Sequence, residues 1–433
     1  MKLSDIKNKK IAIWGYGVEG KATAQYLSNK GIDFTILCKE EERDEKYKCV
    51  TTSVDKELLA GFEVIVKSPG ISPYSPLLKD IDVQMTSATA IWFANERHQA
   101  IDTKVIVVTG TKGKSTTASL LTHVLQQSGK SVNLVGNIGQ ALISSTLDYD
   151  YIVLEASSFQ VYDGNISADI AVITNLFEEH LDWHAGADNY FRDKLNILKA
   201  AKIKIINANN TTLTKLVDEQ DVLYFNAANA FHVKGEELMY DKEIVLNLSQ
   251  VKLIGVHNLE NIGAVLSVCQ QLKLDMAICV EAIKSFKPLA HRLQSLGKIG
   301  QHYAINDSIA TTPVATLAAM KTVDLSNTTL LVGGYDRGNN WQDFADEINE
   351  NPPGLLLISG QNGEIIHQRL QVINAKFRYL LCADLVDAIS LAQLLSPAEG
   401  VILLSPGAPS FDQFDSYIKR GEFFATELRK HET

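Results

Sequence analysis

The 433-residue chain has few features of secreted, membrane-spanning or zinc-stapled proteins. Its five cysteines are odd in number and none stands in a Cys-x-x-Cys pair, which argues against a disulfide framework or a zinc ribbon. No apolar run approaches the ~18 residues of a membrane span. The apolar stretch after the basic N-terminus, Ile11–Trp14, is too short for a signal peptide. We therefore expect a protein of the reducing cytoplasm, without a membrane partner.

Positive charge is also scarce. Lys and Arg number 41 against 51 Asp and Glu, a net charge of -10, which argues against a general nucleic-acid binder and leaves room for a local anion pocket. Hydrophobic residues make up 45% and charged residues 21%, both ordinary for a globular protein. At ~100–200 residues per domain, the length indicates two to four domains.

Strand and helix signals alternate in three blocks, which is typical of α/β domains with parallel sheets. We place the joints near residues 100 and 288, giving domains at 1–100, 101–288 and 289–433. The predicted strands are Ile11–Trp14, Phe34–Leu37, Val64–Val66, Val105–Val108, Tyr151–Leu154, Ile170–Ile173, Thr329–Val332, Leu355–Ile358 and Val401–Leu404.

A glycine loop, Gly15-x-Gly17-x-x-Gly20, follows the first strand and opens a helix. This is the context of a dinucleotide fingerprint. Nicotinamide dinucleotides also need an acidic residue at the end of the second strand, but that strand ends in Leu37-Cys38-Lys39. Three interpretations stay open: a dinucleotide site, a diphosphate site without nicotinamide, and a tight turn without a ligand.

A more specific loop, residues 109–116 (TGTKGKST), joins a hydrophobic strand to a helix. Its amides can surround phosphate oxygens, Lys114 can neutralise them, and Ser115 can offer a hydroxyl to Mg²⁺. The loop is a shortened variant, because Val108 stands where the standard P-loop begins with glycine.

Acidic and histidine side chains follow two further strands. Glu155 comes directly after one strand and, together with the phosphate loop, is predicted to bind Mg²⁺ through its carboxylate. His180-x-Asp182-x-His184 follows the next strand. A metallohydrolase would need more ligands of this type, so a single histidine at a second Mg²⁺, or a capping turn without metal, is favoured.

A series of blocks in fixed order resembles the Mur ligases: TGTKGKST, VGNIG, LEASSFQ, EEHLDWH, GVHNLEN, LAHRLQ, INDSIATTP, GGYDRG and LLSPGAPSFDQF. The resemblance covers nearly the whole chain. It implies an N-terminal Rossmann-like domain for a UDP sugar, a central P-loop ATPase with a parallel sheet, and a C-terminal Rossmann-like domain that closes on it. It also implies the substrates UDP-N-acetylmuramoyl-L-alanine and glutamate, with D-glutamate as the expected acceptor, and a monomer that acts in peptidoglycan precursor synthesis.

The resemblance also assigns the catalytic centre. Lys114 would hold the ATP phosphates, Ser115 and Glu155 would bind one Mg²⁺, and His180 would help to bind a second. Lys194 matches the lysine that becomes carbamylated and then bridges the metals. The residues expected at ATP are Gly110, Thr111, Lys112, Gly113, Lys114, Ser115, Thr116, Asn258, Arg292 and Asp307.

Further residues match the family's substrate contacts. The loops at the N-terminal domain would hold the UDP sugar, Asn137 and Ser157 would line its path to the centre, and residues near the C-terminus would bind glutamate. The set is Gly15, Gly17, Gly20, Ser68, Pro69, Gly70, Asn137, Ser157, His291, Thr311, Arg337, Ser410 and Tyr417.

Four positions depart from the family's pattern. Lys112 replaces a common asparagine, Glu179 replaces an aspartate, Ile309 replaces a lysine, and Arg337 stands where a lysine is usual. Arginine and lysine bind carboxylates differently. L-glutamate therefore stays open as the acceptor.

Three other functions fit the sequence less well. Folylpolyglutamate synthetases share the ATPase blocks but lack an N-terminal βαβ domain. A dehydrogenase is opposed by the missing acid after Leu37 and by the whole ATPase block. A non-catalytic nucleotide-binding protein is opposed by the retained Lys114, Glu155, His180 and Lys194.

Overall fold

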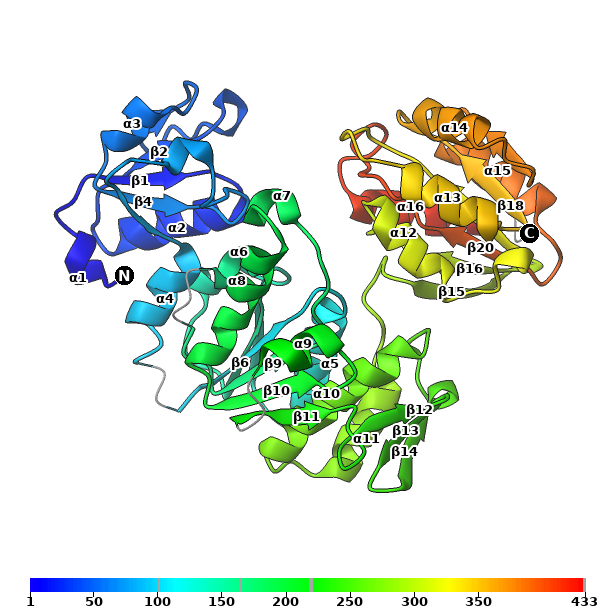
Figure 1. The fold of residues 1–433 in the computed structure, drawn as a ribbon, viewed down its shortest axis with the longest axis horizontal. Helices are drawn as coiled ribbons and strands as arrows, with labels where there is room; N and C mark the ends of the chain where they lie inside the picture. Colours follow the sequence, from blue (N-terminus) through cyan, green and yellow to red (C-terminus); the bar gives the residue numbers. More distant parts are fainter. Residues whose placement is uncertain (100–101, 163–165, 218–220, 431–433) are drawn as a thin grey trace. The chain divides into compact units, whose positions relative to one another are not determined.

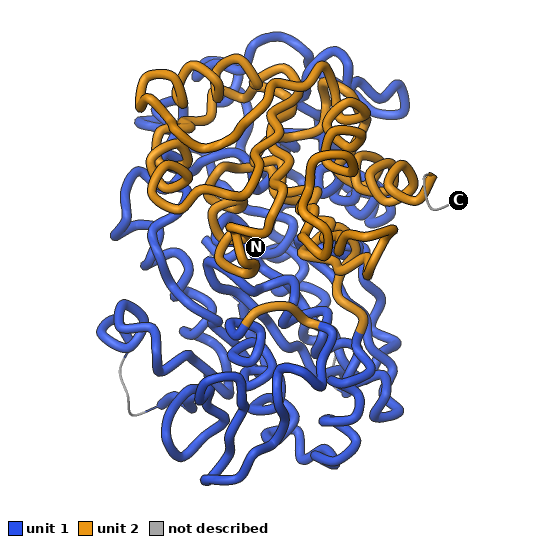
Figure 2. Tube along the Cα trace, turned by 90° about the vertical axis from the view of Figure 1, so that its right-hand side faces the viewer, with its two compact units in different colours: residues 1–252, 256–286 blue, residues 253–255, 287–433 orange. Residues whose placement is uncertain are grey.

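The computed structural model describes residues 1–99, 102–162, 166–217 and 221–430. The chain forms two compact units, one made of residues 1–252 and 256–286 and the other of 253–255 and 287–433 (Figure 2). The first unit contains two large sheets. The joint expected near residue 100 falls at 100–101, outside the described residues, and the three-domain division stays a prediction.

The N-terminal sheet is entirely parallel, in the order β3-β2-β1-β4-β5 (Figure 1). This is the strand order of dinucleotide-binding folds, in which ligands bind beyond the carboxyl ends of the central strands. Its strands are β1 (Ile11–Trp14), β2 (Thr35–Leu37), β3 (Cys49–Val50), β4 (Val64–Lys67) and β5 (Gln84–Thr86). Its helices are α1 (Leu3–Ile6), α2 (Val18–Asn29), α3 (Lys56–Ala60) and α4 (Ala88–Asn95).

The central sheet is also parallel, in the order β11-β10-β9-β6-β8-β7. Because helices cover both faces, the run Val105–Val108 is completely buried. The strands are β6 (Lys104–Thr109), β7 (Val132–Gly136), β8 (Tyr151–Glu155), β9 (Ile170–Ile173), β10 (Ile203–Asn207) and β11 (Leu223–Phe225). The helices are α5 (Lys114–Gln127), α6 (Ser158–Val161), α7 (Leu181–His184), α8 (Ala187–Lys199), α9 (Thr211–Leu216), α10 (His257–Gln271) and α11 (Met276–Ser285).

Successive side chains along the central strands point to opposite faces of the sheet and therefore pack against different helices. Val105, Val107, Ile152 and Leu154 pack in one core with Tyr190 of α8. Helix α5 packs against β7 and β8 and is covered in turn by α10 and α11. The phosphate loop therefore starts from an interior strand of a sheet that is covered by helices on both faces.

A small antiparallel sheet of β12 (His232–Lys234), β13 (Glu237–Tyr240) and β14 (Glu243–Asn247) was not predicted. Its turns use Gly235 and the pair Asp241 and Lys242, all with positive φ, as hairpin turns require. The sheet packs on α10.

The second unit has a mixed sheet in the order β15-β16-β20-β17-β18-β19, in which β15 is antiparallel to β16. The strands are β15 (Gln294–Ile299), β16 (His302–Asn306), β17 (Thr328–Val332), β18 (Leu355–Ile358), β19 (Tyr379–Leu381) and β20 (Val401–Leu404). The helices are α12 (Pro313–Met320), α13 (Gln342–Glu350), α14 (Gly363–Val372), α15 (Leu385–Leu395) and α16 (Tyr417–Arg429).

The predicted α/β class and all nine predicted strands are confirmed, with ends that differ by at most one residue. In the described parts of the chain, no helix combines the length and apolarity that a bilayer crossing demands.

Candidate active site

The loop between β6 and α5 has the shape of a phosphate cradle. Gly113 has φ 82°, and a Cβ there would collide with Oδ1 of Asn261. Gly110 has φ 150° and lies in the same way against Thr174. Gly113 caps the N-terminus of the 14-residue helix α5 without a side-chain hydrogen bond. Backbone amides and the positive end of the helix dipole are therefore available to an anion.

Hydrogen bonds to two other segments, and one within the loop, hold this loop in place. Thr111 N donates to Asn175 O at 3.0 Å, and Thr111 Oγ1 lies 2.8 Å from Tyr190 Oη. Lys112 N donates to Asn175 Oδ1 at 2.8 Å. Lys114 Nζ donates back to Thr111 O at 2.9 Å, which places its charge inside the loop. These bonds hold the loop in a shape that can receive phosphates.

Ser115 and Glu155 place side-chain oxygen atoms next to each other at the base of the loop. Ser115 Oγ donates to Glu155 Oε1 at 3.0 Å, and Asn137 Nδ2 donates to the same oxygen at 3.3 Å. Glu155 is completely buried, and its Oε2 has no hydrogen-bond partner among the described residues. A buried carboxylate oxygen without a partner is costly unless a cation meets it.

The side-chain oxygens of Ser115 and Glu155 fit Mg²⁺, which prefers hard oxygen ligands and is usually held by one or two carboxylates together with substrate phosphates. Within the described ranges, no three His, Cys, Asp or Glu side chains gather as a ready-made metal cage. A metal at Ser115 and Glu155 would therefore need phosphate oxygens to complete its shell.

Lys194 approaches the phosphate loop from α8. It is 2% exposed, and its Nζ donates to Gly110 O at 2.7 Å. Burial, reinforced by the positive charge of Lys114, lowers the pKa of the Lys194 amine well below its usual value. This shift increases the share of the uncharged amine, which is the nucleophilic form.

His180 stands at the same edge of the sheet, at the N-terminus of α7, with φ 55°. Its ring lies 4.9 Å from that of Phe159. Partial burial and the nearby lysines 194 and 114 lower the pKa of His180 although Glu179 opposes them. The neutral imidazole, the form that binds metals, is favoured.

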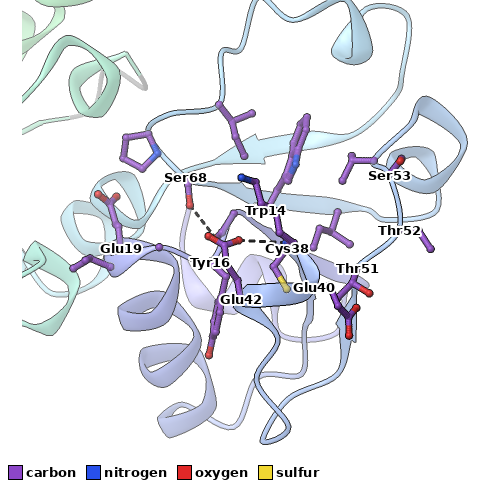
Figure 3. Close-up of a pocket in the computed structure, with 18 residues that line it drawn as sticks. Trp14, Tyr16, Glu19, Cys38, Glu40, Glu42, Thr51, Thr52, Ser53 and Ser68 are labelled. Atoms are coloured by element: carbon purple, nitrogen blue, oxygen red, sulfur yellow. Dashed lines mark hydrogen bonds between the residues drawn. The ribbon is translucent and has the colours of Figure 1, made fainter. Parts of the chain in front are cut away.

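A cavity of about 670 Å³ lies beyond the carboxyl ends of β1, β2 and β4 (Figure 3). Its floor is the glycine loop. Gly15 has φ 91°, a Cβ on it would come within 2.7 Å of Ser68 Oγ, and Ser68 Oγ donates to Gly15 O at 2.9 Å. Gly15, Gly17, Ser68 and Pro69 line the cavity, whereas Gly20 and Gly70 do not. Gly20 instead lies behind the loop, where a Cβ would collide with Gly15 O.

The rim of this cavity carries Cys38 and Lys39 where a nicotinamide site needs an acid. Thr51, Thr52 and Ser53, which follow the neighbouring strand β3, line the cavity as well, and Figure 3 shows Thr51 beside Glu40. Gly17 caps the 12-residue helix α2 without a side-chain hydrogen bond. The cavity can thus take a diphosphate at the helix end and a polar group at the hydroxyls.

The second unit holds a separate cluster of predicted residues. Asp307 Oδ1 accepts from Leu293 N at 3.0 Å and its Oδ2 accepts from Ser405 Oγ at 2.8 Å. Burial raises the pKa of Asp307 to about 6. His291, with its ring 6.3 Å from that of Tyr417, lies 3.1 Å from the side-chain amide of Asn306.

Arg420 ties the loops of this cluster together. It is 3% exposed and donates to Ser308 O at 2.9 Å, Ala408 O at 2.8 Å and Pro409 O at 3.1 Å. Ser410 follows directly and is buried, and the guanidinium of the exposed Arg337 lies 5.5 Å from the ring centre of Phe411. Arg337 and Ser410 thus flank one loop, and Thr311 lies half-buried before α12.

Comparison with known proteins places the chain. Residues 108–269 match the family described as Mur ligase middle domain. A UDP-N-acetylmuramoyl-L-alanine--L-glutamate ligase from Xanthomonas euvesicatoria pv. vesicatoria (strain 85-10) is 38% identical over 98% of this chain and 96% of its own length. A protein of the same name from Salinispora tropica is 32% identical, with 99% of both chains covered. The chain belongs to the Mur ligase family.

Two further similarities concern the fold. The UDP-N-acetylmuramate-alanine ligase of Thermotoga maritima superposes with a TM-score of 0.61 at 18% identity, covering 98% of this Mur ligase and 100% of that chain. The MurF ligase of the same organism, solved with ADP, gives 0.61 at 17% identity, covering 99% and 96%. Residues 5–69 also match the NADPH-binding domain of acetohydroxy acid isomeroreductase, as the strand order of the N-terminal sheet leads one to expect.

Three contact residues of this Mur ligase were missed by sequence reasoning. Asn261 packs against Gly113, donates to Asn258 Oδ1 at 2.9 Å, and so connects Asn258 to the phosphate loop. Tyr190 supports Thr111. Tyr74 reaches α8 from the N-terminal sheet. Only Asn261 had a signal, since it ends the block GVHNLEN.

Proposed function

We propose that the protein is an ATP-dependent ligase that joins the carboxylate of UDP-N-acetylmuramoyl-L-alanine to the amine of L-glutamate in peptidoglycan precursor synthesis. The observation that carries this proposal is the near full-length identity of 36–39% to proteins named UDP-N-acetylmuramoyl-L-alanine--L-glutamate ligase. The phosphate loop, the buried Glu155 and the N-terminal cavity supply the sites that this reaction needs.

L-glutamate replaces D-glutamate as the proposed acceptor. The sequence left this alternative open because Ile309 and Arg337 depart from the usual pair of lysines, and the relatives carry the L-isomer in their names. Moving the cation of a two-carboxylate pocket changes which isomer can present its amine to the acyl carbon.

The reaction proceeds in two steps. A carboxylate oxygen of the sugar nucleotide attacks the γ-phosphorus of ATP, which gives an acyl phosphate and ADP. The glutamate amine then attacks the acyl carbon, loses a proton, and inorganic phosphate leaves with the electron pair of the C–O bond. Because charge moves between phosphoryl and carbonyl oxygens, catalysis depends on positioning and on cations.

This chain's residues have distinct parts in that scheme. Lys114 and the loop amides hold the β- and γ-phosphates, and Ser115 with Glu155 would hold one Mg²⁺ against them. Bound Mg²⁺ supplies charge neutralisation at the transferring phosphoryl group. His180 would hold a second ion.

Lys194 would be carbamylated in the active enzyme. Its uncharged amine nitrogen attacks CO₂, and loss of one proton leaves a carbamate anion that can serve as a metal ligand. The lowered pKa of Lys194 supports this proposal, because the attack on CO₂ requires the lone pair of the uncharged amine nitrogen.

We further propose that the enzyme acts as a monomer in the cytoplasm. All five cysteines are free thiols, which suits a reducing compartment, and one chain supplies each residue assigned above.

The experiment is ligation by the purified protein with ATP, Mg²⁺ and UDP-N-acetylmuramoyl-L-alanine, offered D- and L-glutamate separately. Phosphate release and product mass are measured, with Lys114→Ala and Mg²⁺ removal by EDTA as inactive controls. We expect product with L-glutamate only. Product with D-glutamate alone would reverse the acceptor assignment, and no product with either would refute the function.

A further inference from the structure

A chain of buried hydrogen bonds runs from the N-terminal domain to the segments that carry the catalytic residues. Tyr74 Oη donates to Asp193 Oδ2 at 2.8 Å, and the same carboxylate oxygen lies 2.8 Å from His184 Nδ1. His184 Nε2 lies 2.9 Å from Ser158 Oγ. His184, Asp193 and Ser158 are all at most 3% exposed. We call these four residues the Tyr74–Ser158 chain.

The order serine, histidine, aspartate matches that of a hydrolase triad. A nucleophile, however, must meet its substrate. Ser158 is 3% exposed, and it does not line the described cavity of the N-terminal domain. With Nδ1 facing the carboxylate, the His184 N–H donates to Asp193 and Nε2 can accept from the Ser158 hydroxyl. The chain has the arrangement of a brace, not that of a nucleophile.

Three members of the brace, Asp193, His184 and Ser158, lie in the segments that carry the predicted catalytic residues. Asp193 directly precedes Lys194, and since successive residues of a helix point ~100° apart, one faces His184 while the other faces Gly110. Ser158 directly follows Ser157, which caps α6. His184 ends α7, the helix that begins after His180.

The other end lies in the loop that follows Ser68 and Pro69 at the cavity. Ile71 lines the cavity, Ser72 Oγ donates to Trp183 O, and Tyr74 makes the bond to Asp193. Arg192 Nη2 also donates to Tyr74 Oη, at 2.8 Å. A second link runs beside this one, because Gln160 Nε2 donates at 3.2 Å to Glu19, which lines the cavity as well.

We propose that the Tyr74–Ser158 chain positions Lys194 and makes that positioning depend on the loop at the sugar-nucleotide cavity, so that UDP-N-acetylmuramoyl-L-alanine and ATP bind with positive coupling. This inference rests on the proposed function, since it takes the cavity as the site of the sugar nucleotide. Tyr74, Asp193 and His184 are positioning residues. A ligand that orders the 68–74 loop fixes Asp193, and Asp193 fixes its neighbour Lys194 at the phosphate loop.

The test measures coupling and not activity alone. The Kd of adenylyl imidodiphosphate with Mg²⁺ is determined by calorimetry with and without saturating UDP-N-acetylmuramoyl-L-alanine. We expect the sugar nucleotide to tighten binding about five-fold or more, within the usual range of coupling between sites. Tyr74→Phe, which removes one oxygen, should reduce that factor to less than about two-fold, and Asp193→Asn should do the same.

The matched control is Tyr26→Phe. Tyr26 Oη also donates to a carboxylate, that of Glu96, at 2.5 Å, but this pair lies within the N-terminal domain. The control should keep the wild-type coupling. The double variant Tyr74→Phe/Asp193→Asn should match the single variants, because both break one chain.

The inference is overturned if wild type shows no coupling, if Tyr74→Phe keeps it, or if Tyr26→Phe loses it equally. Tyr74 is half-buried, so its variant tests the idea even where Asp193→Asn fails to fold. Failure of the proposed function gives a different result, because the wild-type protein would then bind neither nucleotide or would release no phosphate with glutamate.

Discussion

Lys112 of the phosphate loop forms an ion pair with Glu179, which precedes α7, with 2.6 Å between Nζ and Oε1. Both residues replace others that are usual in Mur ligases, and the structure shows that the two replacements meet. Burial alone would raise the pKa of Glu179, but Lys112 and Lys114 hold it below its usual value. Glu179 thus pairs with Lys112 beside His180.

Breaking this pair should change ATP binding. Lys112→Asn leaves the Glu179 charge next to the phosphates, so we expect the KM for ATP to rise up to about five-fold, since a partly exposed pair contributes about 1 kcal/mol or less. Lys112→Asn/Glu179→Asp, which restores the usual pair, should return most of that loss. Additive effects in a double-mutant cycle would show that the two side chains act independently.

Lys194→Ala should lower kcat about a hundred-fold or more, because the carbamate that we propose as a metal ligand cannot form. Wild-type enzyme prepared without CO₂ should start slowly and recover when bicarbonate is added. Lys199→Ala, an exposed lysine on the same helix, is the control and should behave as wild type. Full activity of wild type in CO₂-free buffer would remove the carbamate from the scheme.

Arg337→Ala should raise the KM for L-glutamate ten-fold or more, the effect of losing about 1.4 kcal/mol, with little change for ATP. A planar guanidinium binds a carboxylate at two points, so Arg337→Lys should recover only part of the loss. Arg378→Ala, an exposed arginine of the same unit, serves as control. A change confined to the KM for ATP would place Arg337 at the nucleotide.

Asp307→Asn should stabilise the second unit in a pH-dependent way. The folded pKa of Asp307, about 6, exceeds the ordinary aspartate value of 3.8, so the folded form holds its proton more tightly and wild type loses stability as pH rises from 3.8 to 6. Two pKa units correspond to about 3 kcal/mol at most. Asparagine lacks this cost.

The advantage of Asp307→Asn should therefore be largest above pH 6 and shrink toward pH 4. Hydrogen exchange of the β16 amides at several pH values measures it. An advantage that stays constant with pH would show that folding does not raise the pKa of Asp307.

Local patterns were sufficient to predict nine of the strands and the two glycine loops. The run Val105–Val108 is apolar on both faces because both faces are covered, and Gly113 follows it at the point where only glycine fits beside Asn261. These features depend on neighbours in sequence, or on backbone needs that glycine reveals.

Tertiary partners were not predictable in this way. Tyr74 and Asp193 are 119 positions apart, and nothing local to either indicates the other. The β12–β14 sheet was missed because its strands are short and its turn at Asp241 and Lys242 uses neither glycine nor asparagine. The role of Lys194 also depends on tertiary burial, since an isolated helical lysine is expected to face solvent.

Because Asp193 and Lys194 are adjacent on α8, the number of residues between His184 and Lys194 is restricted. One residue inserted between His184 and Asp193 would rotate the rest of α8 by ~100°, moving the lysine away from Gly110 and the carboxylate away from His184 in a single event. Deletion would do the same in the opposite sense. The β13–β14 turn does not have to hold two contacts in this way, so its length can change. Gaps between homologous sequences should therefore be common at residues 241–242 and absent from 184–194.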